Sequence, residues 1–173
     1  MKVIPISLGG FCDPRAYIKV ILKYSKKKGY NSCPFDLCIT SFKQLCDVLK
    51  TDFEYFFDDL KIIPWENARG KRKLAGPGLS CITNKYGIIF NHEGSCHSHL
   101  FKEGKNDDEF YTRDNFKEFK KRYLNRINNF KKYCKDYNDI IFVYKYDNFD
   151  ESVITNIITN KYGKKNIKFI KIP

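Results

Sequence analysis

A cysteine that follows two glycines is the first residue in the sequence that could act as a nucleophile. An apolar run over residues 3–8 ends in Gly9 and Gly10, and Cys12 follows at the start of an amphipathic segment. This order is typical of a buried strand that turns sharply into a helix, because glycine accepts backbone angles that other residues resist. The unpaired N–H groups and positive dipole end of a helix N-terminus favour a thiolate. Cys12 is therefore a candidate nucleophile, although the same position suits an ordinary buried cysteine.

A general base for this thiol has to be one of only three histidines, His92, His97 and His99. A cysteine hydrolase needs a base within hydrogen-bond reach of its thiol and usually a third group that orients the imidazole. His92 ends a strand-like segment, so it should be held more firmly than the other two, which lie in a polar stretch. Asp36 and Asn91 are candidates to orient its ring.

The same histidines allow a second interpretation, a metal site. His92, Cys96, His97 and His99 place four possible ligands within eight residues, and zinc prefers such nitrogen and sulfur ligands. Their spacing matches no standard zinc motif, and there is no paired C-x-x-C. We therefore expect no metal or other cofactor.

A third interpretation uses Ser7 at the end of the first strand, where serine esterases of the SGNH type carry their nucleophile. Those enzymes need a late Asp-x-x-His block, and the C-terminal part of this chain has no histidine. A Ser7 mechanism would have to use His92 instead. Walker A, G-x-G-x-x-G and H-E-x-x-H motifs are absent, which argues against nucleotide kinases, Rossmann dehydrogenases and zincin proteases.

Composition restricts the class of protein further. The 173 residues are 42% hydrophobic, which suits one folded domain, and no apolar run or leader predicts a membrane span or signal peptide. Seven cysteines without a disulfide-framework spacing favour reduced thiols in the cytoplasm. The net charge of +12 makes nucleic-acid binding possible but not favoured, because the lysines are spread along the chain among Asn, Ile and Tyr, as in proteins of AT-rich genomes. The alternative to a hydrolase is a non-catalytic binding protein with this basic surface.

Strand and helix patterns alternate along the chain. The periodicity predicts strands over 3–8, 140–144 and 167–170 and helices over 13–27, 40–49, 110–135 and 150–163. Two further extended pieces are predicted within 81–92, and a long surface loop at 61–80. This order predicts a single α/β domain over residues 1–173, with a mainly parallel sheet and helices on both faces. Ligands bind at the carboxyl ends of the strands in such sheets, and the glycine turn before Cys12 lies at one such end.

Five short motifs, taken in order, resemble a family of bacterial and viral proteins labelled papain-like cysteine peptidases. The motifs are Ser7-Leu8-Gly9-x-x-Cys12, Pro34-Phe35-Asp36, Asn84-Lys85-Tyr86-Gly87 leading to His92, Tyr123-x-x-Arg126-Ile127, and Ile141-Phe142-Val143. The resemblance covers roughly residues 3–145. It differs from the family pattern at Leu37, where a Trp is common, and at Asn125, Asn129 and Tyr144, where arginines are usual.

The resemblance implies a cysteine-dependent hydrolase that acts on a peptide or another acyl substrate. Cys12 would be the nucleophile, His92 the base and Asp36 a polar site residue that orients His92 or substrate. Backbone N–H groups from Gly10 to Cys12 would stabilise the oxyanion. The motif matches further imply substrate-binding roles for Ser7, Gly9, Gly10, Asn84 and Arg126.

Overall fold

Three parallel strands form the first sheet of the computed structural model, which describes residues 3–65 and 79–173. The strands are β1 (Val3–Gly9), β5 (Asp139–Tyr144) and β6 (Asn166–Lys171), in the order β1-β5-β6. β1 and β5 are mostly buried, as their continuous apolar sequences predict for a sheet covered on both faces.

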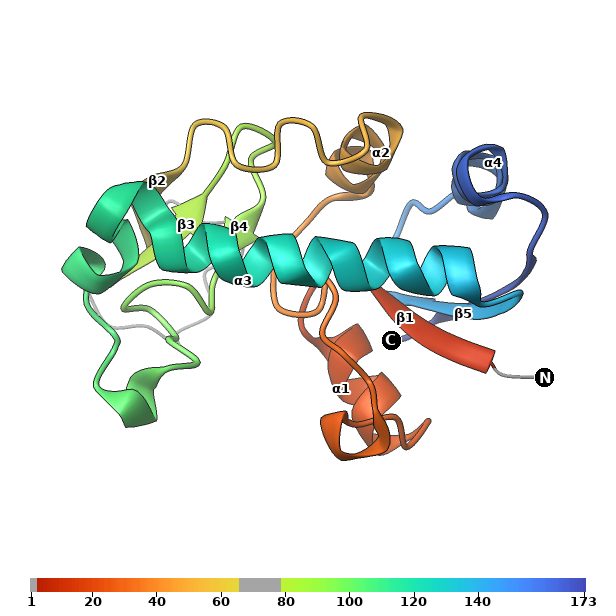
Figure 1. Cartoon of the computed structure of the whole chain (residues 1–173), viewed down its shortest axis with the longest axis horizontal. Helices are drawn as coiled ribbons and strands as arrows, with labels where there is room; N and C mark the ends of the chain where they lie inside the picture. Colours follow the sequence, from red (N-terminus) through yellow and green to blue (C-terminus); the bar gives the residue numbers. More distant parts are fainter. Residues whose placement is uncertain (1–2, 66–78) are drawn as a thin grey trace.

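Four α-helices surround this sheet. They are α1 (Asp13–Val20), α2 (Phe42–Lys50), α3 (Asp108–Asp136) and α4 (Glu151–Tyr162). Figure 1 shows α1 on one side of the parallel strands and α3 and α4 on the other. The prediction of an α/β fold is confirmed. None of the helices in the described residues is long and apolar enough to cross a membrane.

A second sheet is antiparallel and lies beside the N-terminal half of α3 (Figure 1). It contains β2 (Lys61–Pro64), β3 (Ser80–Thr83) and β4 (Ile89–Phe90), in the order β2-β3-β4. The first and last residues of the predicted 61–80 loop thus belong to strands that pair with each other, and residues 66–78 lie outside the described part of the chain.

Helix α1 is shorter than the predicted helix over 13–27. Val20 and Ile21 are 55% and 57% exposed, so the end of the helix has no apolar surface to pack against. The chain turns back instead, and the Tyr24 hydroxyl donates a hydrogen bond to the carbonyl of Val3 at 3.0 Å. This contact anchors the connection after α1 to the start of β1.

Helix α3 packs against residues from both halves of the molecule (Figure 1). Near the antiparallel sheet, Phe119 and Tyr123 pack on Phe90 of β4, with ring centroids 4.9 and 4.8 Å apart. About two to three turns further along, Phe130 packs edge-on against Phe35 at 6.2 Å. This aromatic contact surface fixes β4 relative to the segment that precedes α2.

Candidate active site

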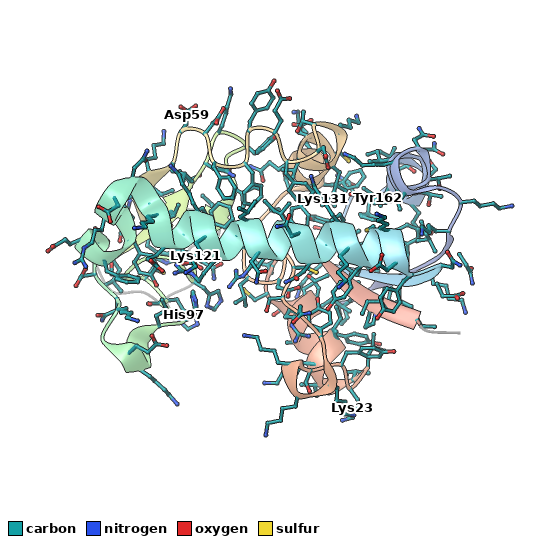
Figure 2. The ribbon with its side chains drawn as sticks, viewed as in Figure 1. Lys23, Asp59, His97, Lys121, Lys131 and Tyr162 are labelled. Carbon is teal, nitrogen blue, oxygen red and sulfur yellow. The ribbon has the colours of Figure 1, made fainter. Side chains whose placement is uncertain are left out.

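Cys12 and His92 meet where the two sheets come together. The Cys12 Sγ atom lies 3.1 Å from Nε2 of His92, although the two residues are 80 positions apart. Cys12 caps the N-terminus of α1, directly after the carboxyl end of β1, and His92 follows β4 by two residues. Figure 2 shows His97, which lies next to this pair, among the side chains below the N-terminal half of α3. The structure thus brings the candidate nucleophile and base into hydrogen-bond contact.

The glycine turn before Cys12 is held against the loop after β5. Gly9 and Gly10 have φ values of +85° and +95°, and a Cβ atom at Gly10 would lie 2.1 Å from the carbonyl oxygen of Lys145. The Gly10 N–H donates to Thr40 Oγ1 at 3.1 Å. The two glycines therefore allow the close packing of this turn, and the Gly10 N–H is occupied by Thr40.

The imidazole of His92 is neutral at pH 7. Burial, followed by the neighbouring charges of His97, His99 and Arg126, lowers its pKa from 6.5 to about 4. A hydrogen bond between the ring and the main chain of His97 acts in the opposite direction, as expected for a carbonyl that accepts from the ring. A neutral imidazole with Nε2 facing the thiol can accept the thiol proton.

A buried carboxylate next in sequence holds the His92 segment in place. Glu93 is fully buried and forms an ion pair with Arg122 of α3, while His99 Nδ1 lies 3.6 Å from its other oxygen. The His92 carbonyl in turn accepts from the His99 N–H at 3.3 Å. The sequence analysis missed Glu93 and Arg122, because neither residue type nor spacing distinguishes a buried ion pair from surface charge.

Asn91 faces the thiol and not the imidazole. Its Nδ2 and Oδ1 atoms lie 3.7 and 3.9 Å from Cys12 Sγ. An amide donor at this place suits the stabilisation of negative charge that develops beside the attacking sulfur. Asn91 was considered for orienting His92, and its position suits an oxyanion donor better.

Asp36 lies in a separate buried network. Its carboxylate accepts from the Cys33 N–H at 2.9 Å and from the Tyr30 hydroxyl at 3.1 Å, and Arg15 Nε is 3.6 Å away. Burial raises the pKa of this carboxyl to about 6, although the three contacts act to lower it. Within residues 3–65 and 79–173 it forms no hydrogen bond or ion pair with His92, so it organises the turn before α2 and the Arg15 side chain.

Ser7 and Asn84 support the main chain. The buried Ser7 hydroxyl donates to the carbonyl of Phe35 at 3.3 Å. Asn84 donates to the carbonyl of Phe56 at 2.9 Å and accepts from the Ile88 N–H at 3.3 Å. These bonds satisfy the polar atoms of both side chains within the fold, and in the described part of the chain neither contacts the thiol or the imidazole.

Arg126 lies close enough to act on His92 electrostatically. It is only 8% exposed, and its guanidinium lies over the ring of Tyr123 at 4.5 Å from the centroid. Its positive charge contributes to the lowered pKa of His92. Of the implied substrate-binding side chains, Arg126 is therefore the one that the structure places near the Cys12–His92 pair.

None of the seven cysteines, all of which lie in the described residues, forms a disulfide, and Cys12 is half-buried while the other six are buried. Cys96, part of the candidate metal set, packs in the apolar cluster around Trp65 and Cys81. No group of three or more His, Cys, Asp or Glu side chains in the described residues could hold a metal ion. The most accessible of the seven thiols is thus also the one beside the histidine.

A thiol held against an imidazole at a strand–helix turn of an α/β fold is an arrangement that cysteine-dependent enzymes use. The comparison with family models gives a description of the same kind. The model described as "Putative papain-like cysteine peptidase (DUF1796)" matches residues 4–168, and the chain belongs to this family. No curated protein and no solved structure matches the chain significantly.

Proposed function

We propose that the protein is a cysteine-dependent acyl hydrolase in which His92 acts as the general base for Cys12. The observation that carries the proposal is the 3.1 Å contact between Cys12 Sγ and His92 Nε2. The half-buried thiol, the neutral imidazole and the family description support it. A peptide bond is the substrate that the family description favours, and reduced thiols suit a cytoplasmic enzyme.

The geometry supports a two-step reaction. In the first step Cys12 Sγ bonds to the substrate carbonyl carbon while His92 Nε2 takes the thiol proton. The tetrahedral intermediate then expels the leaving amine or alcohol, which receives the proton from His92, and a thioester remains on Cys12. In the second step His92 takes a proton from water, whose oxygen attacks the thioester, and the acid is released with the thiol restored.

Two features stabilise the negative charge in this scheme. The Asn91 amide lies 3.7 Å from Cys12 Sγ and would donate to the oxyanion of the intermediate. The N-terminus of α1, which begins directly after Cys12, adds the positive end of its dipole. Both act at the place where charge develops, so they lower the barrier more than they strengthen substrate binding.

The test is acylation of Cys12 by p-nitrophenyl acetate, followed as a burst of nitrophenolate and located by peptide mass spectrometry. We expect acetyl-Cys12 in the wild-type protein, none in Cys12→Ser, and a rate at least 100-fold lower in His92→Ala, as for loss of a general base. Cys46→Ser serves as the matched control, since Cys46 is a buried thiol on α2, a helix that carries neither Cys12 nor His92, and should leave the burst unchanged.

The proposal is wrong if His92→Ala, shown to be folded by circular dichroism, acylates at the wild-type rate. It is also wrong if Cys12 stays unmodified until the protein is denatured. Either result would leave the alternative, a binding protein in which Cys12 has no chemical role.

A further inference from the structure

A basic cavity opens between α1, the short 3-10 helix η1 (Lys26–Lys28) and α3. Its volume is about 670 Å³. Positively charged side chains dominate its lining, with one carboxylate among them: Arg15, Lys19, Lys26, Lys27, Arg126 and Asp36. The carboxylate is already engaged by Arg15, Tyr30 and the Cys33 N–H, so the cavity as a whole attracts anions.

Arg126 is the buried arginine of this lining, and one of its hydrogen-bond donors has no acceptor among the described residues. The residue is 8% exposed, and among the described residues no atom accepts a hydrogen bond from its Nη1. A buried charged donor without an acceptor is costly, and a planar guanidinium suits two parallel hydrogen bonds from an oxyanion. Arg126 lines both this cavity and a neighbouring one along α3, so a ligand held there can reach its guanidinium.

Two lining residues connect the cavity to the segments that carry Cys12 and His92. Arg15 lies on the first turn of α1, three positions after Cys12. His99 also lines the cavity, and its Nδ1 lies 2.8 Å from the His92 carbonyl oxygen. A group held here would therefore lie about one helical turn from Cys12 and one residue contact from His92.

A second cavity extends the first along α3. It measures about 450 Å³, shares Lys26, Ser32, His99 and Arg126 with the first, and adds Arg122. The combined groove has room for more than a single small ion. An anionic group bound against Arg126 would thus leave room along α3 for further atoms of a larger molecule.

We propose that this groove is a substrate subsite that recognises an oxyanion, either a carboxylate or a phosphoryl group, near the bond that Cys12 attacks. The inference that the bound molecule is a substrate rests on the proposed function, whereas the anion-binding site itself does not depend on catalysis. It adds a substrate class, acyl compounds with an acidic group near the scissile bond. Arg126 makes the central contact, and the lysines of η1 and α1 supply the attracting field.

The first test measures binding of inorganic phosphate and of glutarate to full-length Cys12→Ser protein by calorimetry at low salt. We expect Arg126→Gln to weaken binding at least 10-fold, because it removes a charge-assisted donor pair. The double variant Lys26→Gln/Lys27→Gln, which changes exposed side chains and should fold normally, should weaken binding about threefold. Lys28→Gln is the matched control, since Lys28 is exposed in the same helix but lines neither cavity.

Tighter binding of phosphate would assign a phosphoryl group, and tighter binding of glutarate would assign a carboxylate. The proposal is overturned if neither ion saturates below about 10 mM. It is also overturned if Lys28→Gln weakens binding as much as the double variant does, since that would indicate general charge and no defined site.

The second test shows whether the site serves Cys12. The wild-type protein is alkylated with the α-amides of N-iodoacetyl-glutamate and N-iodoacetyl-glutamine, whose iodide leaves as the carbon–sulfur bond forms. We expect the acidic reagent to react with Cys12 at least fivefold faster, an advantage that excess phosphate removes and that the Lys26→Gln/Lys27→Gln double variant reduces about threefold. Equal rates would overturn the assignment as a substrate subsite. If Cys12 reacts with neither reagent while phosphate still binds, the proposed function fails and the anion site stands alone.

Discussion

At the scale of single residues, the protonation state of His92 determines how the pair should respond to pH. Its pKa is lowered from 6.5 to about 4, so the imidazole loses its function as a base only when pH falls through about 4. We expect the rate of Cys12 acylation to hold steady from pH 7 to about 5 and to fall below that with an apparent pKa near 4. Burst rates between pH 3.5 and 7.5 measure this.

A substitution at His97 checks the cause of that shift. The charge of His97 helps to lower the pKa of His92, and the two rings lie 4.5 Å apart. His97→Asn should therefore move the acidic fall in rate to higher pH. A wild-type fall centred between pH 6 and 7 would contradict a neutral, buried imidazole.

Asn91 should contribute to the reaction through its side-chain amide. Asn91→Ala removes the donor beside Cys12 Sγ, and we expect kcat to fall about 100-fold with little change in KM, because the contact strengthens only as the oxyanion forms. Asn128→Ala, an exposed position on α3 that lines neither cavity of the proposed groove, is the control. Unchanged acylation by a folded Asn91→Ala protein would assign the oxyanion to other donors.

The sequence supplied local signals for some of these residues and none for others. Cys12 was found because glycines and a helix pattern flank it, and His92 because it ends a strand-like piece and competes with few other histidines. The sequence allows a contact between these two side chains to be proposed, but it does not give the distance between them. Asp36 was placed near His92 by motif alone, whereas the fold pairs it with Arg15, a partner that depends on how α1 packs.

At the scale of elements, the β1–α1 turn is the most constrained connection in the site. Gly10→Ala would force a Cβ atom to 2.1 Å from the Lys145 carbonyl oxygen at a φ of +95°. We expect it to lower the free energy of unfolding by about 3 kcal/mol, measured by urea denaturation. Gly29→Ala has a similar φ of +84° but open space around its Cβ, so about 1 kcal/mol is expected there.

Equal losses in these two variants would show that backbone strain alone matters, and that the close packing of the turn on Lys145 contributes nothing. The larger loss at Gly10 would instead show that the position of Cys12 depends on the contact between β1 and the loop after β5.

Capping and periodicity predicted the elements with strong local signals. Ser41 and Gln44 form the capping box that starts α2, and Asp150 caps α4. The length of α1 was not predictable from the sequence. The helical pattern of apolar residues continues past Val20, but the folded protein offers no apolar surface there to bury those side chains. Strand β2 was missed because only its pairing with β3, about 20 residues away, makes it a strand.

At the scale of the whole molecule, the site is assembled from two sheets. Cys12 follows the parallel sheet and His92 follows the antiparallel sheet, and α3 packs against β4 and against Phe35 in the segment before α2. Figure 1 shows α3 running past both sheets. Alternation of strands and helices predicts one mainly parallel sheet, and it cannot reveal a second one, since sheet membership depends on long-range pairing. The distance between thiol and imidazole is therefore a property of the packing between the sheets.

This arrangement predicts that core substitutions of similar cost will differ in their effect on the site. Phe90→Leu loses ring contacts to Phe119 and Tyr123 beneath the His92 segment and should cost about 2 kcal/mol. Ile158→Ala, in the buried face of α4, should cost about 3 kcal/mol. Both proteins should remain folded at 25 °C, because domains of this kind have about 5–15 kcal/mol of stability.

We expect Phe90→Leu to slow Cys12 acylation several-fold at 25 °C, since β4 can then shift and lengthen the contact between Sγ and Nε2. Ile158→Ala should leave the rate unchanged despite its larger loss of stability. Urea denaturation and the nitrophenolate burst, measured on the same preparations, separate the two effects. If both variants slow acylation in proportion to their stability loss, the pair depends on global stability and not on the contact between α3 and β4.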